Sequence, residues 1–172
     1  MKSSKGEIRI YVACLAAYNN GHLHGAWIDA EQEPSTIMEE VQAILATSPV
    51  EKAEEWAIHD YDGFEGATIS EYESFVSVSE IAAFVAEFGE LAGGLLGYFG
   101  DIEDARCAME DHYCGQYRSL AEYAEELTDQ TTDVPEHLSL YIDYEHMARD
   151  MAISDVITIE TGFEQVHVFW SH

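Results

Sequence analysis

The alternation of apolar and polar residues near the start of the chain predicts a small antiparallel sheet. Residues 7–15 place apolar side chains at every second position, namely Ile8, Ile10, Val12 and Cys14. The turn signal Asn19-Asn20-Gly21 separates this strand from a second one, which we expect over residues 22–29. Residues 54–61 predict a third strand. The three strands would form one sheet.

Helical spacing predicts one helix between the second and third strands and a helical unit after them. The first helix should begin at the capping box Thr36-Ile-Met-Glu39 and end before Pro49. Further on, Ser77-Val-Ser-Glu80 is a second capping box, and the glycines between residues 89 and 100 are expected to keep the later helices short. The pattern therefore predicts an α+β unit over residues 7–61 and a middle unit of short helices over residues 62–105.

The remaining residues, 106–172, predict a third unit of helices and strands. Ser119-Leu-Ala-Glu122 should cap one helix, and Asp133-Val-Pro-Glu136 should cap another that reaches about Met151. Alternation on either side of Thr161-Gly162-Phe163 predicts a terminal β-hairpin. The expected fold class is α+β, in three small units.

The strongest indication of function in the sequence is its negative charge. The 172 residues include 34 Asp and Glu against 7 Lys and Arg, a formal net charge of −27. Solubility of a small domain needs a net charge of only about 2 to 8 in magnitude, and excess charge opposes compaction. Residues 53–172 have a net charge of −24, which matches the phosphates of about 12 base pairs of duplex. We therefore expect a basic protein surface as the partner, and neither nucleic acid nor an anionic membrane.

Carboxylates are also poorly balanced by cations in residues 101–150. A solvated helix face ordinarily explains an acidic stretch, but such a face interleaves Lys or Arg three or four residues away. Between Arg118 and Arg149 there are eight acids and no Lys or Arg, which on helices would form rows about 5 to 6 Å apart. The candidate partner-binding surface consists of Asp101, Glu103, Asp104, Glu110, Asp111, Glu122, Glu125, Glu126, Asp129, Asp133, Glu136, Asp143 and Glu145.

Metal binding and catalysis have weaker signals. His22-x-His24 lacks a nearby third ligand, so we expect no metal there. The cluster Cys107, His112 and Cys114 lacks the paired spacing of a zinc site, so we expect packing roles for these residues. Asp60, Asp62 and Glu71 match positions 1, 3 and 12 of a calcium loop, but the required Gly at position 6 is Glu65. The chain contains none of the common nucleophile, phosphate-loop or dinucleotide motifs. We expect no enzyme, metal or cofactor.

Cysteine use and local hydropathy indicate the compartment. Three cysteines are an odd number without framework spacing, which is typical of a reducing cytosol. The first residues lack the apolar run of a signal peptide, and the most apolar stretch, residues 81–99, contains Glu87 and Glu90. A cytoplasmic protein without a membrane span is therefore expected.

A segment near the C-terminus is recognisable. Val134-Pro135-Glu-His-Leu138-Ser-Leu-Tyr141-Ile142-Asp143-Tyr144-Glu-His-Met-Ala148-Arg149-Asp150 resembles the acidic antirestriction motif of ArdA proteins. The resemblance extends to Tyr11-Val12-Ala13, Tyr18-Asn19, Gly21 and Gly25-Ala26-Trp27, and to Trp56-Ala57-Ile58-His59-Asp60-Tyr61 followed by Ile69-Ser70-Glu71-Tyr72. It covers almost the whole chain and is weakest over residues 82–115.

The resemblance implies an elongated, three-part homodimer, carried by mobile elements. Such a protein inhibits Type I restriction-modification enzymes by occupying the DNA-binding groove of the methyltransferase core, so that restriction and modification are blocked. The motif residues would then serve partner contact, dimer contact or folding. The charge is also compatible with two alternatives. One is a salt-adapted structural protein whose acids serve hydration, and the second is a cation-binding or hydrolytic domain that uses Asp60, Asp62 and Glu71.

Overall fold

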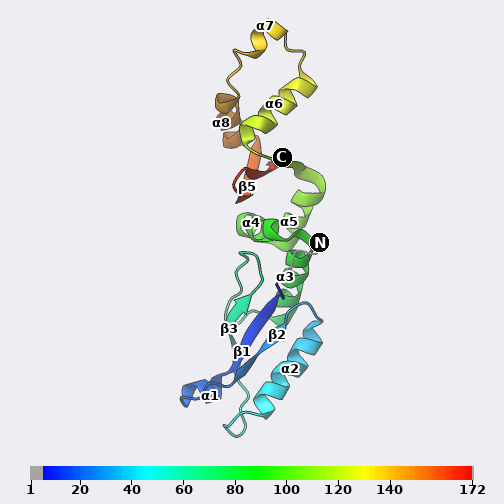
Figure 1. Ribbon diagram of the computed structural model, residues 1–172. Coiled ribbons are helices and arrows are strands. Elements are labelled where there is room, and N and C mark those ends of the chain that lie inside the picture. The colour runs from blue at the N-terminus through cyan, green and yellow to red at the C-terminus, as the bar shows by residue number, and fades with distance from the viewer. Residues whose placement is uncertain (1–5, 172) are drawn as a thin grey trace. The chain divides into compact units, whose positions relative to one another are not determined.

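Figure 1 shows the computed structural model of the chain, which describes residues 6–171. The chain divides into two compact units, one that ends at Gly93 and one that begins at Gly94. Each unit contains a three-stranded antiparallel sheet with helices, so the predicted α+β class is confirmed. None of the described helices is long and apolar enough to cross a membrane. The division into three units stays a prediction.

The sheet of the first unit has β1 (Arg9–Cys14) in the centre, between β2 (Gly25–Asp29) and β3 (Trp56–Asp62). The alternating residues Ile10, Val12 and Cys14 are buried, as the pattern predicted. Helix α2 (Pro34–Ala46) contacts β1 and β2, and its buried residues Ile37, Val41 and Leu45 recur at helical spacing. A short helix that was not predicted, α1 (Leu15–Asn19), lies between β1 and β2. One face of this sheet therefore forms the core of the unit.

The two helix starts predicted from capping boxes in the first unit are wrong. Helix α2 begins at Pro34 instead of Thr36, because the fixed φ and missing N–H of proline suit the first turn of a helix. Helix α3 (Phe75–Phe88) begins after Ser74, whose hydroxyl accepts a hydrogen bond from the Ser77 N–H at 3.1 Å. Ser77 therefore lies inside the first turn rather than at its cap.

Helix α4 (Glu90–Phe99) continues unbroken through Gly93, Gly94 and Gly97. Helix α3 ends just before it at Gly89, whose φ of +60° favours glycine. A Cβ added at Gly94 would lie 2.4 Å from the Cγ2 atom of Ile159 in β5 (Val156–Gly162). At this position glycine allows close packing of the helix on the second sheet.

The sheet of the second unit has β6 (Gln165–Trp170) in the centre, between β4 (Tyr113–Tyr117) and β5. Strands β5 and β6 form the predicted terminal hairpin. Strand β4 was not predicted; it follows α5 (Ile102–Cys107) and the π-helix η1 (Ala108–His112). Gly115, with a φ of +119°, lies at the register shift between β4 and β6, so the strand lacks a regular alternation.

Three helices complete the second unit: α6 (Leu120–Thr131), α7 (Glu136–Ser139) and α8 (Tyr144–Ser154). The cap at Ser119 is confirmed, because its hydroxyl accepts a hydrogen bond from the Glu122 N–H at 3.1 Å. The single helix predicted from residue 133 to about Met151 is wrong. Helix α7 ends at Ser139, and Asp143 caps α8 separately by accepting from the His146 N–H at 3.0 Å.

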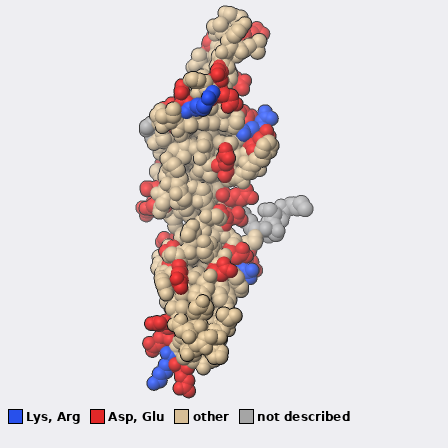
Figure 2. Space-filling view, turned by 90° about the vertical axis from the view of Figure 1, so that its left-hand side faces the viewer, with Lys and Arg blue, Asp and Glu red and all other residues tan. Residues whose placement is uncertain are grey.

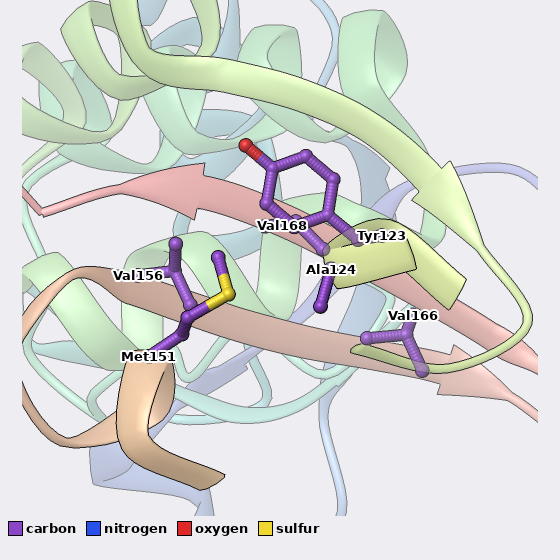
Figure 3. Packing of buried hydrophobic residues seen from close by; sticks show 6 residues of the cluster. All are labelled: Tyr123, Ala124, Met151, Val156, Val166 and Val168. Carbon is purple, nitrogen blue, oxygen red and sulfur yellow. The ribbon is translucent and has the colours of Figure 1, made fainter. Parts of the chain in front are cut away.

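Residues from four elements form the core between the helices and the second sheet (Figure 3). Helix α6 contributes Tyr123 and Ala124, and α8 contributes Met151. The sheet contributes Val156, Val166 and Val168. Helices α6 and α8 also contact each other, so this core fixes both acidic helices on the sheet.

Candidate partner-binding surface

The candidate carboxylates lie on the surface of the second unit. Twelve of the thirteen are exposed, and Glu122 is half-buried. Asp101, Glu103 and Asp104 lie at the start of α5, where the Asp101 carboxylate accepts from the Glu103 N–H at 2.7 Å. The others occupy η1, α6, the segment before α7, α7 itself and the start of α8: Glu110, Asp111, Glu122, Glu125, Glu126, Asp129, Asp133, Glu136, Asp143 and Glu145.

Helix α6 carries the densest row. Glu122, Glu125, Glu126 and Asp129 line an open groove of about 550 Å³ together with Gln116, Tyr117 and Gln130. Asp129 and Gln130 also line a second open groove of about 520 Å³, which continues through residues 131–134. The row follows the helical spacing that the sequence indicated. Figure 2 shows Asp and Glu side chains on both units of the face that it views, with fewer Lys and Arg.

The tyrosines beside α6 are held in their neutral form. Burial, together with the nearby Glu126 carboxylate, raises the pKa of Tyr117 to about 12, and the Tyr117 hydroxyl donates to the Cys114 carbonyl at 3.3 Å. Burial, with the charges of Asp129 and Glu125, also raises the pKa of Tyr144. An additional negative charge, such as a tyrosinate, is thus disfavoured next to these carboxylates. The same negative potential favours a cation at this place.

Arg118, next to the carboxylate row, contacts Glu122 at the start of α6. Arg118 lies 3.6 Å from the Glu122 carboxylate, and its backbone N–H donates to the same carboxylate at 2.7 Å. Glu122 therefore helps to close the start of α6, where orphan N–H groups favour an acceptor. Glu125, Glu126 and Asp129 are exposed and lie further along the helix. The structure thus separates one capping carboxylate from three on the open row.

Residues 10–165 match the family model described as "Antirestriction protein (ArdA)". The chain belongs to the ArdA antirestriction protein family. Membership implies an antirestriction function and an interaction with restriction-modification enzymes. A comparison with curated proteins found no match.

In this ArdA protein, the segment that resembles the antirestriction motif, residues 134–150, has a packed part and an exposed part. Tyr144 and Ala148 of α8 face the core, as does Met151 just beyond the motif. Leu138 and Tyr141 are exposed to 47% and 84%. The other motif residues are the half-buried Val134 and Ile142 and the exposed Pro135, Asp143, Arg149 and Asp150. The motif therefore supports the fold through α8 and offers an apolar surface around α7.

The polar residues of the motif make local contacts. Arg149 donates to the Glu145 carbonyl at 3.4 Å, and the Asp150 carboxylate lies 3.6 Å from the His146 ring. Asp143 is the N-cap of α8. These residues therefore help to hold the helix that carries them.

The other candidate groups of the sequence are dispersed in the ArdA fold. Asp60 and Asp62 lie in the extended strand β3 instead of a calcium loop, and Glu71 lies 4.0 Å from the His59 ring. The His24 ring contacts the Ile44 carbonyl at 2.7 Å. In residues 6–171, no three or more His, Cys, Asp or Glu side chains are grouped so that they could hold a metal ion.

A packing role was wrong for Cys107, which is exposed. Its thiol donates to the Asp111 carboxylate at 3.5 Å. This hydrogen bond and the neighbouring carboxylates raise the pKa of the Cys107 thiol. The thiol is therefore kept protonated and poorly nucleophilic.

The sequence reasoning missed the carboxylates of the first unit. Residues 1–93 contain seventeen of the 34 acids, as many as residues 94–172. The eight acids between Arg118 and Arg149 directed the sequence-based prediction to residues 101–150. A count by structural unit would have shown that both units contain the same number of acids.

Proposed function

We propose that this ArdA protein is a DNA mimic, which inhibits Type I restriction-modification enzymes by binding the DNA-binding groove of their methyltransferase core. Binding there would exclude incoming DNA from restriction and from modification. The observation that supports this most directly is the exposed carboxylate row on α6, at the edge of an open groove. The proposal explains why so much acidity is kept on a folded protein.

The charge density of the row is close to that of nucleic acid. Glu122 and Asp129 are seven residues apart in one helix, which corresponds to about 10 Å at 1.5 Å per residue. Four carboxylates over that length are separated by three intervals of about 3.5 Å on average, close to the roughly 3.4 Å between charges along one strand of a duplex. A groove that binds phosphates would therefore meet a similar potential along α6.

We further propose that the protein forms a homodimer in the cytoplasm. Leu138, Leu140 and Tyr141 are exposed to 47%, 92% and 84% around α7, and apolar side chains that cluster on a surface often mark a protein contact. Sedimentation at micromolar concentration should give about twice the chain mass of 19.3 kDa. A clean monomer would remove the dimer and leave the inhibition proposal standing.

Competition against labelled duplex for a purified Type I methyltransferase tests the proposed function. The protein should displace the duplex stoichiometrically, and it should do so without added calcium. Failure to displace the duplex would overturn the proposal. Two further outcomes would favour the alternatives. Unfolding at low ionic strength would indicate salt adaptation, and stabilisation by micromolar calcium would indicate a cation-binding domain.

A further inference from the structure

The first unit presents a second surface on the face of its sheet opposite α2. Strand register places Tyr11 of β1 between Trp27 of β2 and Asp60 of β3. Two residues before Tyr11 in the same strand, Arg9 lies between Asp29 and Asp62. Directly paired residues of antiparallel strands share a face, so these six side chains lie on one side of the sheet. We call this set, residues 9, 11, 27, 29, 60 and 62, the tryptophan face.

The aromatic residues of the tryptophan face are arranged by contacts within the sheet. The Tyr11 and Trp27 rings meet edge to face, with 5.4 Å between their centroids. A Cβ added at Gly25 would lie 3.0 Å from the Tyr11 Cζ atom and 2.4 Å from the Val12 carbonyl. Glycine at that position therefore leaves room for the Tyr11 ring beside Trp27, whose side chain is 40% exposed.

The same face already holds one cation. The guanidinium carbon of Arg9 lies 4.5 Å from the centroid of the Trp27 ring, which is cation–π geometry. The guanidinium also lies 3.5 Å from the Asp62 carboxylate. An aromatic ring and a carboxylate thus bind one guanidinium together. Asp29 and Asp60 are exposed next to this arrangement, so the face keeps a net negative charge.

Charge complementarity identifies the occupant. The tryptophan face holds Asp29, Asp60 and Asp62 against Arg9, so an acidic peptide, or the same face of a second copy, would be repelled there. Arginine and lysine side chains of a basic protein surface would find both carboxylates and an aromatic ring, which together suit a guanidinium better than an ammonium.

We propose that the tryptophan face is a second contact surface of the inhibitor, which takes arginine side chains of the partner enzyme on Trp27 and the neighbouring aspartates. This inference rests on the proposed function and extends its contact to the first unit. Arg9 occupies part of the face in the free protein, so the partner's arginine replaces it on the ring. The contact is therefore partly aromatic, in contrast to the purely carboxylate row of α6.

The substitution Trp27→Leu tests the aromatic contribution without changing charge. We expect affinity for a purified Type I methyltransferase to fall about 2- to 5-fold, the range of an exposed cation–π contact. The slope of log affinity against log salt should not change, because no charge is lost. Asp60→Asn should reduce that slope. Tyr72→Leu is the control, because Tyr72 is 68% exposed in the same unit and follows β3 rather than lying on the sheet.

Arg9→Gln is the second variant, and it leaves the ring in place. Affinity should rise, because the competing guanidinium is gone and the face becomes more acidic. Circular dichroism and thermal unfolding check that each variant is folded. If the parent protein fails to displace the duplex, the proposed function itself fails. If the parent competes and Trp27→Leu competes equally well, or Arg9→Gln shows no gain, only the tryptophan face is refuted.

Discussion

Neutralising three carboxylates of α6 should stabilise this protein while it weakens inhibition. The variant Glu125→Gln, Glu126→Gln, Asp129→Asn removes the exposed part of the row and leaves Glu122, which accepts from the Arg118 N–H. Opposite effects on stability and activity follow from the proposed function, in which the row contacts the partner and costs free energy in the isolated chain.

The gain in stability follows from the helical spacing. The row contains four like-charge pairs three or four residues apart. Each such pair destabilises a helix by about 0.2 to 0.5 kcal/mol, which gives about 0.8 to 2 kcal/mol in all. Asp129 also lies in the last turn of α6, where a negative charge opposes the helix dipole by a further 0.3 to 1 kcal/mol or so. Removing these terms should raise the free energy of unfolding by about 1 to 3 kcal/mol.

Thermal unfolding at low and high salt measures this gain. Each kcal/mol corresponds to roughly 2 to 4 °C for a chain of this size, and the gain should shrink at 1 M salt as screening increases. In the competition assay, three exposed charges at about 0.2 to 1 kcal/mol each correspond to about 3- to 150-fold weaker inhibition. Gln130→Ala, which lines both grooves without a charge, is the control and should change neither quantity.

Two results would refute this reasoning. A triple variant less stable than the parent would show that the carboxylates support the fold rather than strain it. A triple variant that inhibits as well as the parent would show that α6 lies outside the contact.

Four further predictions test single residues. Ser119→Ala should lower the free energy of unfolding by about 1 kcal/mol in urea titrations, because it removes the cap of α6; no loss would show that the cap is dispensable. Met151→Ala should cost about 2 to 5 kcal/mol by the same measurement, because the side chain is 8% exposed in the core; a smaller cost would mean that α8 is loosely held. Asp143→Asn should keep stability and inhibition while Asp143→Ala loses stability, since Asn can cap α8; equal loss in both would assign the role to charge. The pKa of Tyr117 is about 12 in the folded protein and about 10 in the unfolded chain, so its contribution to stability should be present below pH 10 and be lost as the pH rises to 12. Glu126→Gln should lower the pH at which Tyr117 ionises, measured by tyrosinate absorbance. An unchanged pH of ionisation would exclude Glu126 as a cause of the raised pKa.

Strong alternation and strong helical spacing made the main elements of this fold predictable. Ile10, Val12 and Cys14 are buried on one face as expected, and the hairpin of β5 and β6 forms where its pattern lies. The capping box at Ser119 is correct because the same residues also begin a helical apolar stripe. Local and tertiary preferences agree at these places, which is the condition for successful prediction.

The errors occur where several local signals compete. Ser74 and Ser77 are both able to cap α3, and the packing of Phe75 inside the core decides for the earlier residue. The single helix after Asp133 is divided because Asp143 starts a new one. Strand β4 depends on a bulge at Gly115 and on its partner β6. Its local sequence therefore lacks the alternation that would predict a strand.

The acidic row on α6 was predictable in the same way, because spacing of three and four residues fixes which carboxylates share a helix face. The tryptophan face was not. It combines Arg9, Trp27 and Asp62 from three strands, and strand register is a tertiary property. Charge counting along the chain finds rows within one element and misses surfaces that are assembled from several.

The most direct test of the account is the rate at which this ArdA protein associates with a purified Type I methyltransferase at increasing salt. The Debye length shortens from about 10 Å at 0.1 M salt to about 3 Å at 1 M salt. The association rate should therefore fall steeply, and more than the dissociation rate rises, because electrostatic steering acts on the encounter. A parallel gel shift with duplex should show no binding. An association rate independent of salt, or a shifted duplex, would contradict the DNA-mimic mechanism.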